Sequence, residues 1–221
     1  MSLLVFALLL VSVSLGSVSI PFSEIVEILF GGESSKSSWD LIVLNFRLPK
    51  AMTAMIVGSG LGISGLLMQT LFRNPLAGPF VLGISSGASL GVALLILGSS
   101  IFGGVLATLA LYNWAIALAS SLGAALVLLA VLLAASKVRN TMSILIIGLM
   151  FGTVTAAIIS VLTFFSDAQQ IQQYIFWSFG SLGNLSWQEI WILITIYLMG
   201  IIGILFVIKP LNSMLLGENY A

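Results

Sequence analysis

Long runs of apolar residues, separated by short polar segments, dominate this chain from end to end. A helix rises about 1.5 Å per residue, so about 20 apolar residues cross the hydrocarbon core of a bilayer. The pattern therefore predicts an all-α fold, a polytopic transmembrane helical bundle with about six spans in this chain. The runs are 3–20, 51–72, 80–99, 114–135, 143–166 and 190–208.

The first and last runs need separate interpretation. A signal-peptide core is one interpretation of 3–20, but no lysine or arginine precedes it and no A-x-A pattern follows it. We therefore expect an uncleaved first span, although the run begins abruptly at Met1. We expect the last helix to stop at Lys209-Pro210, because proline lacks the N–H that a continuing helix needs.

Two of the polar connections are longer than a turn. The segment 21–46 contains a short helix that we expect to start near Pro21 and Ser23 and to end at Gly31. It should lie on the membrane surface or over the bundle. The segment 167–189 combines glutamines with aromatic residues that suit an interface, and its glycine-serine pieces suit turns.

The runs 51–72 and 80–99 are predicted to form an antiparallel hairpin. The segment between them contains prolines and a glycine that would break a continuing helix. Small residues recur at helical spacing in both runs and allow close approach of helices. We expect the two runs to pack on each other through the glycines Gly58, Gly62, Gly83, Gly87 and Gly91.

Composition narrows the chemistry. Hydrophobic residues make up 60% of the 221 positions and charged residues only 6%, against about 25% in soluble domains, so the chain is an integral membrane protein. Its net charge of zero gives no nucleic-acid footprint. The absence of cysteine and histidine removes disulfides, thiolate nucleophiles, histidine acid–base catalysis and most transition-metal sites. We expect no cofactor and no enzymatic activity.

The distribution of charge bears on energy coupling. The stretch 74–136 contains no charged residue at all. Ion-coupled carriers usually hold the coupling ion with ionisable groups inside the membrane, so energy for uphill transport would have to come from another subunit. No G-x-x-x-x-G-K-[ST] phosphate loop is present, so that subunit would also have to hydrolyse the ATP. A secondary transporter, or another polytopic membrane protein not driven by ATP, remains the alternative.

An ordered set of motifs occupies 47–91: RLPK, ISGLLMQ, NPLAGP and LGISSGA. This set resembles the permease subunits of ATP-binding cassette (ABC) importers for iron–siderophores, haem and cobalamin. The resemblance implies one transmembrane permease domain over 1–221, with 21–46 periplasmic and 209–221 starting a cytoplasmic coupling loop. Such permeases have ten spans in total, and beyond the position of Ala221 they continue through the rest of this loop and four further spans. We therefore expect this chain alone to support no ATP-driven uptake.

The resemblance also suggests roles for individual residues. In similar permeases the basic residues of an RLPR-type motif face the periplasm and pair with carboxylates of a substrate-binding protein, and Arg47 and Lys50 match them. The alternative is that both anchor a helix end at the headgroups. Positions 216–218 match the family's pattern before the helix that couples to the ATPase. The residues are Leu216, Gly217 and Glu218 for coupling, and Asn140 and Thr141 for a cytoplasmic gate or, alternatively, a helix N-cap.

The resemblance further implies partners and a location. These are an ABC ATPase subunit, a periplasmic or lipid-anchored substrate-binding protein, a second copy of the chain in a homodimer and membrane lipid, in the bacterial plasma (inner) membrane. No residue of the sequence distinguishes a siderophore, haem or cobalamin as the substrate. The charges of the loops determine the orientation of the chain in the membrane only weakly. With the N-terminus inside, the cytoplasmic loops hold Arg73, Lys137, Arg139 and Lys209, and the outside holds Lys36, Arg47 and Lys50.

Overall fold

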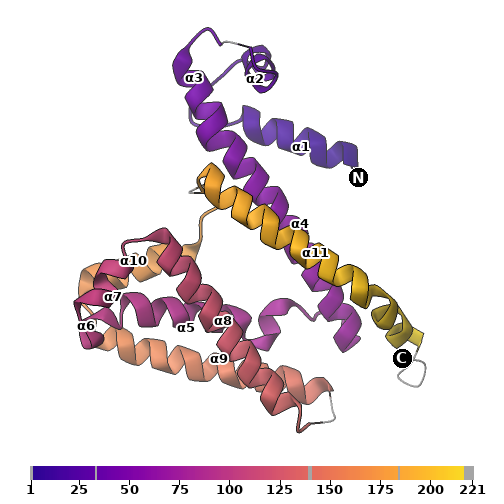
Figure 1. Ribbon diagram of the computed structural model, residues 1–221, viewed down its shortest axis with the longest axis vertical. Coiled ribbons are helices and arrows are strands. Elements are labelled where there is room, and N and C mark those ends of the chain that lie inside the picture. The colour runs from indigo at the N-terminus through magenta and orange to yellow at the C-terminus, as the bar shows by residue number, and fades with distance from the viewer. Residues whose placement is uncertain (1, 33, 139–140, 184, 217–221) are drawn as a thin grey trace. The chain divides into compact units, whose positions relative to one another are not determined.

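The computed structural model describes residues 2–32, 34–138, 141–183 and 185–216. Helices and the turns between them make up the whole described part, which confirms the all-α prediction (Figure 1). The helices are α1 Ser2–Ser14, α2 Phe22–Leu29, α3 Ser37–Ile42, η1 Val43–Arg47, α4 Leu48–Phe72, η2 Pro79–Leu82, α5 Ile84–Ile96, α6 Ser99–Phe102, α7 Gly104–Leu109, α8 Asn113–Ala135, α9 Thr141–Phe164, α10 Ala168–Phe179 and α11 Trp187–Leu216.

Five helices of the described residues are long and apolar enough to cross a membrane, where the apolar runs predicted about six. The run 3–20 accounts for the difference. Its helix α1 has 13 residues and is therefore about 20 Å long, shorter than a bilayer core of about 30 Å. The helix stops where the sequence turns to serine and glycine, which are poorer helix formers than leucine. The five spans are Ser37–Phe72, Ile84–Ile101, Asn113–Ala135, Ser143–Phe164 and Trp187–Leu215.

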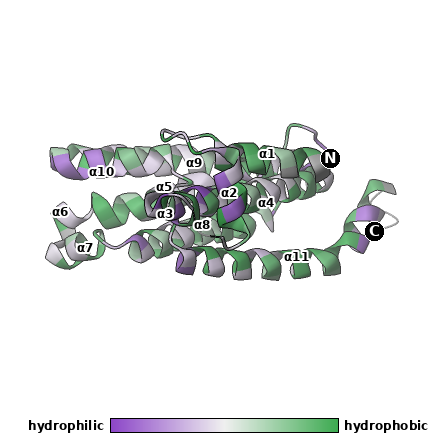
Figure 2. Cartoon of the chain, turned by 90° about the horizontal axis from the view of Figure 1, so that it is seen from above, coloured by the Kyte–Doolittle hydropathy of each residue, from purple (hydrophilic) through white to green (hydrophobic). Residues whose placement is uncertain are grey.

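The prediction that the last helix stops at Lys209-Pro210 was wrong. Helix α11 continues through Pro210 to Leu216. A proline inside a helix leaves one carbonyl, here that of Phe206, without its backbone donor. Membrane helices tolerate this loss, because their neighbours and local backbone adjustments supply other partners. Figure 2 shows hydrophobic residues along α11, in contrast to the hydrophilic residues gathered in α10.

The segment 21–46 contains the predicted short helix and, in addition, the start of the helix that was expected to begin at residue 51. α2 ends before Gly31, whose φ of 83° suits glycine, as the sequence predicted. The segment from Ser37 is helical as well, and it continues through the π-helical turn η1 into α4 without a break. A π turn inserts one extra residue, and here it lies directly before Leu48-Pro49.

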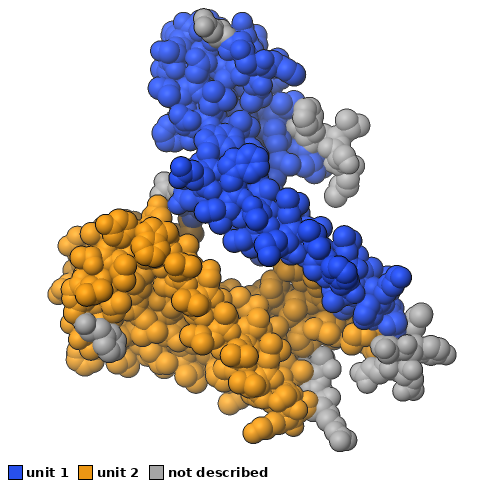
Figure 3. Space-filling model, in the orientation of Figure 1, with its two compact units in different colours: residues 1–63, 181–213, 221 blue, residues 64–180, 214–220 orange. Residues whose placement is uncertain are grey.

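The chain divides into two compact units, coloured separately in Figure 3. The first consists of residues 1–63 and 181–213. Its core joins the end of α1 to α2, η1 and the start of α4. The fully packed side chains of this core are Val13, Ile20, Ile25, Ile28, Val43 and Ala51.

The second unit consists of residues 64–180 and 214–220 and is built around α5, which packs on α8 and α9. The helix α10 lies in the connection 167–189, where the sequence indicated interfacial aromatic residues and turns at the glycine-serine pieces, and it starts with a capping box. The Asp167 side chain accepts from the backbone of Gln170, whose own side chain accepts from the Asp167 N–H. The Gln170 amide also donates to Ser99 Oγ at 2.8 Å, which fastens α10 to the start of α6.

Candidate functional site

The RLPK motif lies where η1 passes into α4 in the first unit. Arg47 is the last residue of η1, and Lys50 lies within the first turn of α4. Only 9% of the Arg47 surface is exposed, whereas Lys50 is an exposed residue. Two basic residues three positions apart therefore occupy different environments.

Arg47 is held by backbone carbonyls. Its Nη1 donates to the carbonyl of Val13 at 3.0 Å and to that of Ser14 at 2.9 Å, and its Nη2 donates to the carbonyl of Val18. Val13 and Ser14 end α1, so their carbonyls lack intrahelical donors and carry the partial negative charge of a helix C-terminus. The guanidinium thus caps α1 and also binds the turn that follows it.

Gly16 makes room for this contact. A Cβ on Gly16 would lie 2.8 Å from Arg47 Nη2 and 2.9 Å from Cζ, which is closer than a Cβ approaches other atoms, so the guanidinium would have to shift. The absence of a side chain at Gly16 thus allows the guanidinium to lie directly against the turn.

The other side of the junction is bound by α11. The indole Nε1 of Trp187 donates to the carbonyl of Leu44 at 3.1 Å. In a π turn the partner of residue i is residue i+5, as shown by the Leu48 N–H, which donates to the Val43 carbonyl. The equivalent partner of Leu44 would be Pro49, which has no N–H. The carbonyl is thus available to Trp187, a residue that the sequence indicated only as an interfacial aromatic.

The predicted packing glycines fall into two groups. A Cβ on Gly87 would lie 2.6 Å from the carbonyl oxygen of Gly123 in α8, and one on Gly91 would meet the carbonyl of Ala119. Gly83 has a φ of 74° and faces α9. The hairpin prediction paired these glycines with 51–72, but the structure pairs them with α8 and α9. Within the first unit, a Cβ added to Gly58 or Gly62 would meet no atom from outside the local helix backbone within 4 Å.

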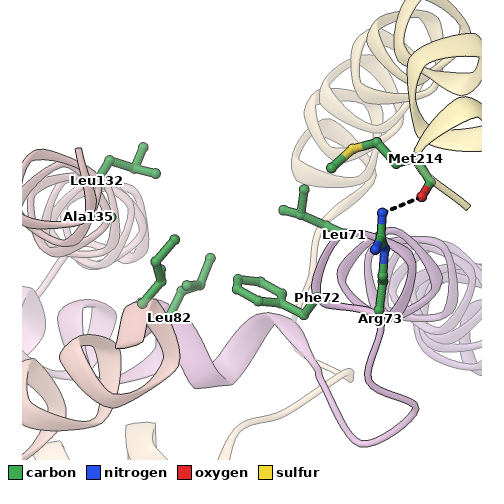
Figure 4. A pocket seen from close by; sticks show the side chains of 8 residues that line it. Leu71, Phe72, Arg73, Leu82, Leu132, Ala135 and Met214 are labelled. Atoms are coloured by element: carbon green, nitrogen blue, oxygen red, sulfur yellow. Dashed lines mark hydrogen bonds between the residues drawn. The ribbon is translucent and has the colours of Figure 1, made fainter. Parts of the chain in front are cut away.

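The second unit contains a pocket of about 210 Å³ with a mostly apolar lining (Figure 4). Its one basic residue is Arg73, which has a φ of 48° and whose Nη2 donates to the Met214 carbonyl at 2.7 Å. The arginine side chain is thus engaged in a backbone contact at the edge of an apolar pocket. The lining residues are Leu71, Phe72, Arg73, Leu82, Leu132, Ala135, Ile144 and Met214.

Several predicted site residues lie outside the described residues. These are Asn140 of the gate pair and Gly217 and Glu218 of the coupling motif. Thr141 begins α9 and Leu216 ends α11, so each motif is described in part only. Both roles stay predictions. The part of the chain that the structure describes contains no group of three acidic residues that could hold a metal ion.

Residues 3–221 match the FecCD transport family. The chain is 32% identical over 219 residues to the vitamin B12 import system permease protein BtuC of Klebsiella pneumoniae, which covers 99% of this chain and 60% of that protein. The chain is also 32% identical over 191 residues to the vitamin B12 import system permease protein BtuC of Salmonella paratyphi A. This match covers 86% of this chain and 56% of that protein. The chain thus spans about three-fifths of the length of these relatives.

A solved structure of a metal-chelate type ABC transporter, in an inward-facing conformation, has a similar fold. Its TM-score is 0.78 at 24% sequence identity, and the match covers 99% of this chain and 64% of that chain. The likeness supports the helical fold, and the five apolar helices make this a multi-pass membrane protein.

Proposed function

The chain belongs to the FecCD transport family, and from this membership we propose that it is the transmembrane permease subunit of an ATP-driven importer of a metal chelate. The observation that carries the proposal is the match of the family over 3–221, which includes the RLPK junction and all five apolar helices. The substrate class is iron–siderophore, haem or cobalamin. The relatives are named for vitamin B12 import, which favours cobalamin.

The distribution of charge supports ATP as the source of energy. The spans Ile84–Ile101, Asn113–Ala135 and Ser143–Phe164 contain no acidic or basic residue. Such spans offer no ionisable group to bind a coupling proton, unlike those of secondary transporters. A separate ABC ATPase subunit then supplies the work, and two copies of the permease alternate access to a pathway between them.

The partners meet the permease at opposite ends of the spans. A binding protein delivers the chelate at the periplasmic face of the inner membrane, where Lys50 and the RLPK junction lie. On the cytoplasmic side, the loop that begins with Leu216, Gly217 and Glu218 leads to the ATPase. The pair Asn140-Thr141 narrows the cytoplasmic end of the pathway.

Purification from native membranes tests this function. The gene is tagged at its own locus, the membranes are extracted in mild detergent, and the captured complex is assayed for ATP hydrolysis. We expect an ATP-hydrolysing subunit to co-purify, and disruption of the gene to abolish uptake of one labelled chelate among cobalamin, haem and ferric siderophores. Capture without any ATPase, together with unchanged uptake of all three chelates, would contradict the proposal.

A further inference from the structure

We propose that the pocket of the second unit binds part of an acyl chain of an anionic phospholipid, and that Arg73 and Lys137 bind the phosphate of the same lipid. The inference requires a multi-pass membrane protein, which the apolar helices provide. It does not depend on the proposed importer function, because the lipid is a ligand of the helices themselves.

The lining of the pocket suits a hydrocarbon chain. Arg73 is the one charged residue in the lining, and the other lining side chains are apolar. Phe72 and Leu82 are buried members of the core of this unit and form the inner wall. Leu71 and Leu132 form the mouth of the pocket, with 42% and 52% of their surfaces exposed. Figure 4 shows Leu82 and Leu132 on one side of the pocket and Leu71 and Phe72 on the other, so a chain can enter between them from the lipid.

The volume of the pocket favours part of a large ligand over a complete small one. Pockets that enclose a whole small molecule usually measure about 300–1,000 Å³. This pocket measures about 210 Å³. An acyl chain can insert a few methylene groups into such a space and leave the rest of the lipid in the bilayer.

The basic residues of the second unit lie at the end that contains the pocket. Arg73 directly follows Phe72 at the end of α4, and Lys137 lies two residues after Ala135, which ends α8 and lines the pocket. Both basic residues are exposed. The acidic residue among the described residues of this unit is Asp167, beyond the far end of α9, a helix about 35 Å long whose first turn lines the pocket. Within the described residues, this end of the unit thus attracts an anion and has no carboxylate to compete for the cations.

Arg73 is placed between the apolar pocket and the polar surface. Its Nη2 donates to the Met214 carbonyl at 2.7 Å, which holds the guanidinium at the edge of the pocket. That bond uses one N–H of a group that carries several, so other N–H groups are available to phosphate oxygens. Basic pockets between membrane helices bind anionic headgroups in this way.

The simpler alternative is that both cations only contact headgroups at the membrane surface, without any site. In that case the shape of the pocket would have no effect on lipid binding. A side chain that fills the pocket therefore distinguishes the two arrangements, because it displaces only a lipid whose acyl chain lies inside.

The first measurement is the affinity for two lipids, determined by native mass spectrometry of the chain in an uncharged detergent. Dioleoyl-phosphatidylglycerol and dioleoyl-phosphatidylcholine have the same acyl chains, but only the first is anionic. Arg73→Gln and Lys137→Gln should each weaken binding of phosphatidylglycerol by about fivefold and leave that of phosphatidylcholine unchanged. Lys36→Gln, which removes an exposed cation of the first unit, is the charge-matched control and should change neither affinity.

The second measurement changes the pocket and keeps the charge. Leu132→Trp places an indole at the mouth, and we expect it to weaken binding of phosphatidylglycerol by about tenfold, because several methylene groups lose their apolar surroundings. Leu133→Trp is the matched control, since Leu133 is the next residue of α8, has 62% of its surface exposed and does not line the pocket. It should leave the affinity unchanged.

Glycerol phosphate, a headgroup without acyl chains, distinguishes a lipid from a free phosphate ester. We expect it not to displace phosphatidylglycerol at equal concentration. Displacement would show a site for a soluble anion and would overturn the proposal. Equal affinities for the two lipids, or equal effects of Leu132→Trp and Leu133→Trp, would overturn it as well. Lys137→Gln changes an exposed residue in a turn, so it still tests the role of charge if Arg73→Gln does not fold.

Discussion

Gly91 of α5 and Ala119 of α8 lie in contact at a helix crossing that has no room for a side chain: a Cβ on Gly91 would meet the Ala119 carbonyl oxygen. Gly123 completes the crossing from the other helix, since its own Cβ would meet the Gly87 carbonyl. The two backbones therefore pack directly on each other. In lipid, where apolar side chains gain nothing by leaving the solvent, such close packing is a main source of helix association.

The close packing of α5 on α8 predicts that a single methyl group added at position 91 lowers the stability. We expect Gly91→Ala to lower the stability of the second unit by about 1–3 kcal/mol, because α8 must retreat from α5. Thermal unfolding in detergent measures the effect. Gly200→Ala in α11 is the matched control, since no atom lies within 4 Å of its added Cβ. Equal unfolding temperatures for the two variants would contradict the packing of α5 on α8.

The glycines also show how far sequence reasoning extends. Spacing identified Gly87 and Gly91 as residues that allow close approach, because a small residue every fourth position makes a groove on a helix. It could not identify the partner, since any nearby helix fits such a groove. Proximity in the chain favoured 51–72, whereas Gly123, from a helix further along the chain, forms the crossing.

The bond from Trp187 to the Leu44 carbonyl predicts an interaction between distant positions. Trp187→Phe removes the donor and should cost about 0.5–1.5 kcal/mol of stability. In a Pro49→Ala background the cost should be smaller, because the new N–H of residue 49 can serve the same carbonyl. A double-mutant cycle of unfolding free energies measures the difference. Strictly additive effects would show that the proline does not leave this carbonyl to Trp187.

The connections were harder to predict than the spans. Run 114–135 was predicted within one residue of α8, because a long apolar run has few other solutions in lipid. α10 was missed, although the box Asp167-x-x-Gln170 is a helix start signal that the sequence contains. The partners of Arg47 left no local signal at all, since they lie about 30 positions away and only the fold brings them together.

The segment between α2 and α3 should respond to acid. Ser35 donates to the Glu24 carboxylate from its hydroxyl and from its backbone N–H, and these bonds lower the pKa of Glu24. Because the folded pKa is lowered, the contact stabilises the segment above the unfolded pKa and is lost as the pH falls through the folded pKa. A titration of the Glu24 carboxyl by NMR should show a higher pKa in Ser35→Ala, and no change in the control Ser34→Ala. An unchanged pKa in Ser35→Ala would contradict the contact.

Arg73 combines an unfavourable backbone conformation with a favourable contact. Its φ of 48° lies in the left-handed region, which costs a residue other than glycine about 1–2 kcal/mol. Its Nη2 donates to the Met214 carbonyl, an interaction that helps to offset this cost. The turn after α4 thus contains an arginine where backbone geometry alone would favour glycine.

Two substitutions of Arg73 separate the cost of the left-handed backbone from the contribution of the contact with the Met214 carbonyl. Arg73→Ala loses the contact and keeps the conformational cost, whereas Arg73→Gly loses the contact and relieves the cost. We therefore expect Arg73→Gly to be more stable than Arg73→Ala by about 1 kcal/mol in thermal or denaturant unfolding. Arg73→Lys, which keeps a donor and a charge, should fall closest to the unaltered chain. If the alanine and glycine variants were equally stable, the backbone at this position would not be left-handed, and the contact to Met214 would have no conformational cost to offset.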